Sequence, residues 1–284
     1  MIFDERRYTK QKLPMTVSHC QRAIHSIRQA TQDPTDPHGA WRAALLSVDF
    51  RRQIVDQHVR RCYGLTVQAG PFAGMKYVAG AAGSLYSPKI LGSYEQELHP
   101  YIRTLPNYRR FLNVGCGEGY YAVGAKVLVP DIEVFAFDID PDAITKCREL
   151  AAVNGVTTGL NLENECTTGR LAELARPGSL VMLDIEGAEV ALLDGLPSET
   201  AAQCDFLVET HNVATGMTLS AMVAAFAGTH EITIVDQQPR DWQLYPELHA
   251  LGQLDRFLAQ WEGRGPEPWV FAKARASAAR SGGG

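Results

Sequence analysis

The chain has 284 residues, of which 45% are hydrophobic and 21% are charged. This balance excludes an intrinsically disordered chain and supplies enough apolar side chains for a sizeable core. The 27 basic and 32 acidic residues give a net charge of −5. Because long contacts with a phosphate backbone need clustered Lys and Arg, this charge disfavours nucleic acid as a partner.

The cysteines and the opening sequence bear on the cellular compartment. The six cysteines contain no CxxC pair, which excludes a zinc ribbon and disfavours a disulfide framework. The opening sequence MIFDERRYTKQKLP lacks the apolar run of a secretory signal, and no apolar stretch approaches the length of a bilayer span. We therefore expect a cytoplasmic protein with reduced thiols and no membrane partner. Self-association into an oligomer is compatible with this composition.

Residues 1–90 differ in character from the rest of the chain. Apolar side chains over residues 17–27 and 41–59 fall at helical spacing. The following segment, LTVQAGPFAGMKYV, has the short extended runs and the glycines of a hairpin. We predict that residues 1–90 form a helical region plus a hairpin that acts as a lid or an acceptor-site element.

Short apolar runs alternate with helical segments from residue 111 onward. The runs are FLNVG, IEVFAF, LVMLD, DFLVE, ITIVD and WVFAK, and a long insert at residues 237–268 separates the last two. Strand–helix alternation of this kind implies an α/β fold with helices on both faces of the sheet. We expect a doubly wound, mostly parallel sheet within a domain of residues 91–275, followed by a flexible tail at 276–284.

The first apolar run leads directly into a glycine-rich loop, Gly115 to Gly119. Glycines let backbone amides approach a ligand closely, and the N-terminus of the following helix favours negative charge. The last position of a GxGxxG dinucleotide pattern is Tyr120, which disfavours NAD. The second run ends at Asp138, where a carboxylate can accept both hydroxyls of a ribose. The alternative is a tight turn beside a surface carboxylate, but the strand–helix context favours a nucleoside ligand.

The segment from Phe111 to Val156 resembles the class I S-adenosylmethionine-dependent methyltransferases in its glycine loop, second-strand acid and following Asn-Gly turn. Asn113 stands where that family often has Asp. The run LDIEGAEVALLDG, at residues 183–195, is similar to the Asp-x-Glu-Gly-x-Glu signature of the FkbM-type family, and Gly92-Ser93-Tyr94-Glu95 is also similar to that family. The resemblance covers roughly residues 90–275.

This resemblance implies a seven-stranded methyltransferase-type sheet and S-adenosylmethionine as the cofactor. It also implies which residues bind that cofactor: Glu95, Asn113, Gly115, Cys116, Gly117, Gly119, Asp138, Ile139 and Asp184. Within the loop, we interpret Cys116 as a small residue that fits the turn, since nothing nearby in the sequence would stabilise a thiolate.

Acidic residues and a histidine follow the predicted fourth and fifth strands, at the edge where open α/β sheets bind ligands. The catalytic candidates are His211, Glu209 and Asp184. With an ordinary pKa of ~6.5, His211 is the best general base, and Glu209 could orient it. It could equally be a plain strand-end histidine. The three side chains could instead hold a divalent ion, although we favour the metal-free interpretation. Glu186 and Glu189 begin a helix, where negative charge is favourable in itself.

These features together predict a methyltransferase that, by resemblance to its family, methylates oxygen on a small molecule such as a sugar or a natural product. One alternative is a different use of the same cofactor, an intramolecular displacement that releases methylthioadenosine. Another is a cofactor-binding partner module without turnover. RNA methylation is a weaker alternative, because the chain is acidic and has no evident RNA-binding module. The acceptor pocket is expected from residues 1–90 and 237–268.

Overall fold

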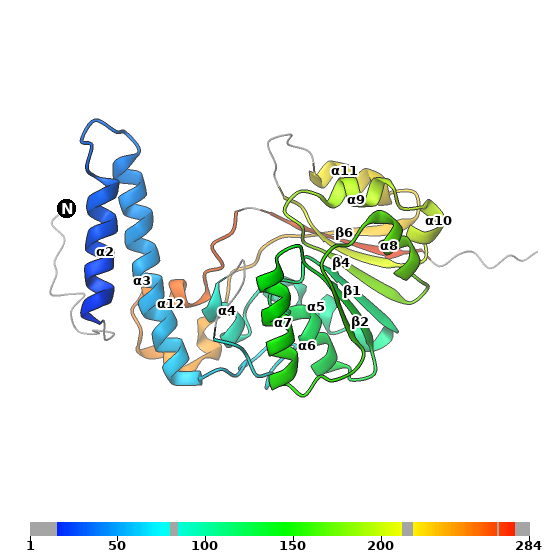
Figure 1. Cartoon of the computed structure of the whole chain (residues 1–284), viewed down its shortest axis with the longest axis horizontal. Coiled ribbons are helices and arrows are strands. Elements are labelled where there is room, and N and C mark those ends of the chain that lie inside the picture. The colour runs from blue at the N-terminus through cyan, green and yellow to red at the C-terminus, as the bar shows by residue number, and fades with distance from the viewer. Residues whose placement is uncertain (1–15, 80–84, 212–217, 266, 276–284) are drawn as a thin grey trace, which may run out of the picture.

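The computed structural model describes residues 16–79, 85–211, 218–265 and 267–275, so the opening sequence and the predicted tail at 276–284 lie outside it. One sheet of seven strands, in the order β3-β2-β1-β4-β5-β7-β6, organises the chain (Figure 1). The strands are β1 (Arg110–Val114), β2 (Glu133–Phe137), β3 (Leu160–Glu163), β4 (Ser179–Leu183), β5 (Asp205–Glu209), β6 (His230–Val235) and β7 (Trp269–Ala274).

Strands β1 to β5 pair in parallel, and β7 runs antiparallel to both β5 and β6. Residues of β1 and β4 are almost entirely buried, as expected for central parallel strands covered on both faces. The predicted α/β fold with a doubly wound, mostly parallel seven-stranded sheet is therefore confirmed. The strand order reverses between β1 and β4, which places the ligand-binding crevice at their carboxyl ends.

Helices cover both faces of the sheet (Figure 1). One face carries α6 (Tyr120–Leu128) and α7 (Pro141–Val153), whose buried residues share a core cluster with Phe111, Met182 and Leu207. The opposite face carries α8 (Thr168–Leu174), α9 (Glu189–Asp194), α10 (Ser198–Ala201) and α11 (Thr218–Phe226). Side chains of a strand alternate between these two cores, because successive residues of a strand point to opposite faces.

The N-terminal part contains two antiparallel helices, α2 (Val17–Ala30) and α3 (Gly39–Tyr63), which lie away from the sheet (Figure 1). The predicted hairpin takes the form of a short antiparallel turn after α3: Thr66 bridges Lys76, the Val67 amide donates to the Met75 carbonyl at 2.9 Å, and no longer strands are paired among the described residues. Its glycines turn the chain so that Phe72 packs edge-on against Tyr120 and Tyr121 of α6. Docking of the Phe72 ring on α6 thus accompanies this short backbone pairing.

The chain then enters the domain through α4 (Tyr86–Leu91), η1 (Gln96–Leu98), α5 (His99–Ile102) and η2 (Leu105–Asn107). The insert between β6 and β7 forms η3 (Trp242–Leu244), η4 (Pro246–Ala250) and α12 (Gln253–Gln260). Helix α12 packs on α3, where Arg51 donates hydrogen bonds of 2.7 Å and 2.5 Å to the Asp255 carboxylate. The N-terminal helices and the insert therefore support each other. Across the described ranges, no helix has both the length and the apolar character needed to span a bilayer.

Candidate functional site

The glycine loop at the end of β1 has a backbone that side chains would obstruct. Gly115, Gly117 and Gly119 have φ angles of 79°, 53° and 92°, in the region that glycine adopts most readily. A Cβ on Gly115 would overlap the carbonyl oxygen of Asp184, and one on Gly119 would overlap the Cys147 sulfur. The loop is therefore held directly against the end of β4, and its Gly115 and Cys116 amides fix it to β2 by donating hydrogen bonds to the Phe137 carbonyl.

Asp138 follows β2 and closes the loop from the other side. Its Oδ2 accepts a hydrogen bond of 2.7 Å from the Gly117 amide, and its Oδ1 accepts one of 2.9 Å from the Asp140 amide. A carboxylate has about four lone-pair sites, so both oxygens can still accept from a ribose. The neighbouring Ile139 side chain is 84% exposed, which leaves an apolar surface beside the carboxylate.

Two buried groups complete the loop region. The side-chain oxygen of Asn113 is buried and finds no hydrogen-bond partner among the described residues. A hydrogen bond with Cys147 and burial raise the pKa of the Cys116 thiol far above its usual range, so it stays protonated. Four features of this region suit an adenosyl ligand. They are the unpartnered Asn113 oxygen, the glycine loop, the Asp138 carboxylate and the exposed Ile139 side chain. The predicted cofactor residues other than Glu95 therefore lie around one loop.

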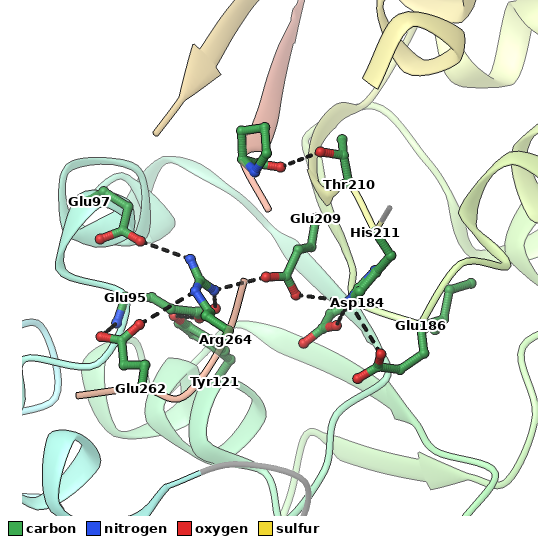
Figure 2. Close-up of polar contacts among 12 residues, drawn as sticks. Glu95, Glu97, Tyr121, Asp184, Glu186, Glu209, Thr210, His211, Glu262 and Arg264 are labelled. Carbon is green, nitrogen blue, oxygen red and sulfur yellow. Dashed lines mark hydrogen bonds and ion pairs between the residues drawn. The ribbon is translucent and has the colours of Figure 1, made fainter. Parts of the chain in front are cut away.

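Glu95 belongs instead to a buried ion-pair network centred on Arg264. Arg264 pairs with Glu95, with Glu97 at 2.9 Å and with Glu209 at 2.9 Å (Figure 2). Tyr121 also donates a hydrogen bond to Glu95, and burial raises the pKa of Glu95 to about 8. Sequence reasoning missed Arg264, whose only signal is its place in the insert shortly before β7.

Asp184, Glu209 and His211 meet as predicted at the ends of β4 and β5 (Figure 2). His211 Nε2 lies 3.4 Å from Glu209 Oε2, 3.5 Å from Asp184 Oδ1 and 3.6 Å from Glu186 Oε2. Its Nδ1 lies 2.8 Å from Oε1 of Glu189, which is completely buried. Sequence reasoning treated Glu186 and Glu189 as helix-start carboxylates, yet both face the histidine.

The charge state of this cluster differs from the one expected for a free base. Burial lowers the pKa of His211, but its hydrogen bonds with Glu189 and Glu209 outweigh this effect and raise it to about 11. Burial and the Glu209 carboxylate raise the pKa of Asp184. Burial likewise raises the pKa of Glu209. These carboxylates therefore favour the protonated imidazole in this arrangement, whereas the expected role of general base requires the neutral form.

A pocket of about 760 Å³ opens beside the cluster, over the insert. Its wall carries aromatic and cationic side chains, with Arg256 stacked on Trp242 at 3.8 Å and Phe257 stacked near Trp261. Arg264 lines the pocket and also contacts Glu209, so the pocket adjoins the end of β5. The insert thus forms a wall next to the candidate catalytic residues.

Comparison with known proteins gives a consistent but distant picture. No family model matches the chain. A release factor glutamine methyltransferase from Deinococcus radiodurans is 45% identical over 47 residues, which is 16% of this chain and 17% of that protein. The chain thus matches less than a fifth of the length of that relative.

Solved structures similar to the chain include methylases of several kinds. A ribosomal protein L11 methylase from Lactobacillus delbrueckii has a TM-score of 0.46 and 16% identity, with 71% of this chain and 86% of that chain covered. Human methyltransferase 10 domain containing protein has a TM-score of 0.46 and 10% identity, with 80% and 96% covered. A putative rRNA methylase from Clostridium thermocellum has a TM-score of 0.43 and 12% identity, with 63% and 96% covered. The sheet described above is the Rossmann-like methyltransferase type.

These names correct the expected partner. A small-molecule acceptor, with nucleic acid disfavoured, was predicted from the acidic net charge and the family resemblance. The similar structures include proteins named for rRNA and for a ribosomal protein, so the prediction is wrong as a restriction on the acceptor. The physical reason is that a net charge averages over the whole surface. It does not describe a local wall such as the one that holds Arg256 and Trp242.

Proposed function

We propose that this chain is an S-adenosylmethionine-dependent methyltransferase. The observation that carries the proposal is the convergence of the glycine loop and Asp138 at the reversal of strand order, where the Gly117 amide meets the Asp138 carboxylate. The cofactor supplies a methyl group bound to a positively charged sulfur. Asp138 would accept the ribose hydroxyls, Ile139 would pack against the adenine, and the Gly115 to Gly119 loop would lie against the rest of the ligand.

The acceptor side of the proposal lies at the ends of β4 and β5. The protein must align the acceptor with the methyl carbon, since methyl transfer is an in-line displacement in which the carbon–sulfur bond breaks as the new bond forms. Asp184 touches the glycine loop and faces His211, so it links the two halves of the crevice. We propose oxygen as the accepting atom and an FkbM-type enzyme, on the strength of the Asp184 to Glu189 run at this position.

The insert forms the acceptor wall in this proposal, and the N-terminal region supports the insert. The insert lines the pocket beside Glu209, and α3 supports the insert through Arg51 and Asp255. The scattered cysteines favour a cytoplasmic setting. Residues 91–275 act as the cofactor-binding domain.

Calorimetry with S-adenosylhomocysteine tests the proposal directly. We expect Asp138→Ala to weaken binding at least tenfold, because hydrogen bonds to a charged group are worth about 1.5–3 kcal/mol each and about 1.4 kcal/mol equals one decade. The matched control is Asp131→Ala, an exposed carboxylate that precedes the amino end of the same strand. NAD should show no binding. Absence of S-adenosylhomocysteine binding by the unmodified chain would refute the function.

A second measurement follows the transferred group. The chain is incubated with S-adenosylmethionine carrying a labelled methyl group, together with RNA and protein fractions of a cell extract. Transfer into either fraction gives the acceptor class. Release of methylthioadenosine without any methylated product would instead favour intramolecular displacement.

A further inference from the structure

His211 Nε2 is the common focus of three carboxylates that come from different places in the chain. Asp184 follows β4, Glu186 lies in the next loop and Glu209 ends β5 (Figure 2). Their nearest oxygens lie 3.4–3.6 Å from Nε2, which is longer than a good hydrogen bond. Ligand atoms bound ~2.1 Å from one metal ion lie roughly 3.0 Å apart in an octahedral site and roughly 3.4 Å apart in a tetrahedral one. The spacing therefore matches atoms that share one ion.

The other ring nitrogen of His211, Nδ1, is hydrogen-bonded to a carboxylate, as is usual for histidines that bind metals. Nδ1 lies 2.8 Å from the buried Glu189 carboxylate, which can hold the Nδ1 proton while a cation displaces the proton of Nε2 to solvent and binds the lone pair that faces the cluster. The same Glu189 oxygen accepts from the amides of Ile185 and Gly187 at 3.1 Å and 3.2 Å. One buried carboxylate thus orients the histidine and the loop that carries Glu186.

The surrounding charges also suit a cation. Glu209 divides its oxygens, with Oε1 bound to Arg264 at 2.9 Å and Oε2 turned toward His211. Asp184, Glu186 and His211 each offer one ligand atom, and these atoms lie within 4.8 Å of one another. Glu209 and His211 are nearly buried, whereas the Glu186 side chain is 87% exposed, so the cluster is closed on the protein side and open toward the crevice.

We propose that Asp184, Glu186 and His211 bind one divalent cation, with Glu209 beside them and Glu189 as the residue that positions the histidine. One imidazole among oxygen ligands suits a first-row transition ion such as Mn²⁺ better than Ca²⁺. Its open side can take an oxygen of the methyl acceptor and lower the pKa of a bound hydroxyl. That role rests on the proposed function, but the binding of the ion does not.

Titration of the EDTA-treated full chain with Mn²⁺, without any cofactor, tests the site. We expect saturable binding of one equivalent and a nitrogen coupling in the pulsed electron spin resonance spectrum of bound Mn²⁺. His211→Ala should abolish the coupling and weaken binding more than tenfold. Glu189→Gln should weaken it about 10–100-fold, as other outer residues of metal sites do. The exposed Glu186→Gln carries little folding risk and should weaken binding several-fold.

The control is Glu173→Gln, an exposed carboxylate in a surface ion pair, which should bind Mn²⁺ like the unmodified chain. Absence of saturable binding, or binding with unchanged affinity in His211→Ala, would overturn the site and leave a protonated histidine held by carboxylates. S-adenosylhomocysteine is titrated separately into the metal-free chain. Retained S-adenosylhomocysteine binding without Mn²⁺ binding overturns the metal site alone, and the reverse result overturns the methyltransferase proposal alone.

Discussion

Two groups of functional residues share the carboxyl edge of the sheet, and they are built in different ways. The group around β1 and β2 comes from one continuous stretch, residues 113–139, and depends on backbone conformation. The group around β4 and β5 draws side chains from residues 95–97, 184–189, 209–211 and 262–264, and depends on buried charge (Figure 2). A local motif can specify the first, whereas only the complete fold assembles the second.

The largest expected effect tests the backbone group. Gly115→Ala places a methyl group in the space of the Asp184 carbonyl oxygen, at a φ of 79° that side chains rarely adopt. We expect a loss of more than about 4 kcal/mol in the free energy of unfolding, at the upper end for single substitutions. Urea denaturation measures it. Gly228→Ala, where nothing lies within 4 Å of the added carbon, is the control and should change stability little. Equal stability of the two variants would contradict a tightly packed loop.

The next effect tests the buried-charge group. Arg264→Met leaves the carboxylates of Glu95 and Glu209 buried without their shared cation, which should cost about 3–5 kcal/mol. The matched control is Arg170→Met, because Arg170 also pairs with two carboxylates but lies at the surface. Exposed pairs contribute about 0–1 kcal/mol. If both variants lose the same stability in urea, burial does not distinguish the two networks.

The smallest expected effect concerns His99, which follows Glu95 closely in the chain, and the pH dependence of stability. Burial lowers the pKa of His99 to about 4, and its Nε2 contacts the Tyr94 carbonyl oxygen at 3.3 Å. As the pH falls from 6.5 toward 4, His99 becomes protonated in the unfolded chain but stays neutral in the folded chain. The free energy of unfolding therefore decreases. When the pH is lowered from 7.5 to 5.0, we expect the free energy of unfolding of His99→Gln to fall by about 1 kcal/mol less than that of the unmodified chain. A group that stays neutral in the folded chain costs about 1.4 kcal/mol of stability for each pH unit below its ordinary pKa. Because His99 is partly exposed, we expect a smaller effect.

Urea unfolding at the two pH values measures this difference. His25→Gln on α2 is the control, because His25 is exposed and its replacement should leave the pH dependence unchanged. A His99→Gln variant with the same pH dependence as the unmodified chain would show that His99 does not resist protonation.

The sequence predicts features that local chemistry determines. The alternation of apolar runs and helical segments predicts the sheet. The sequence spacing predicts that Asp138 lies beside the glycine loop, because a strand–helix–strand motif brings the ends of its two strands together. Arg264 escaped prediction because its partners lie far away in the chain and share no local pattern. The hairpin is limited to one short bridge, and glycine spacing does not reveal that Phe72 within it docks on a helix.

The docking of Phe72 on α6 has a consequence for protein engineering. Gly124 lies within α6, where glycine costs roughly 0.5–1 kcal/mol relative to alanine. A Cβ at this position would lie 2.7 Å from the Phe72 ring. The close contact of the ring with α6 therefore requires glycine, although glycine makes the helix less stable. The ring and the glycine form a matched pair across two segments. A chimera that joins this N-terminal region to another catalytic domain therefore needs a glycine at the corresponding turn of the helix.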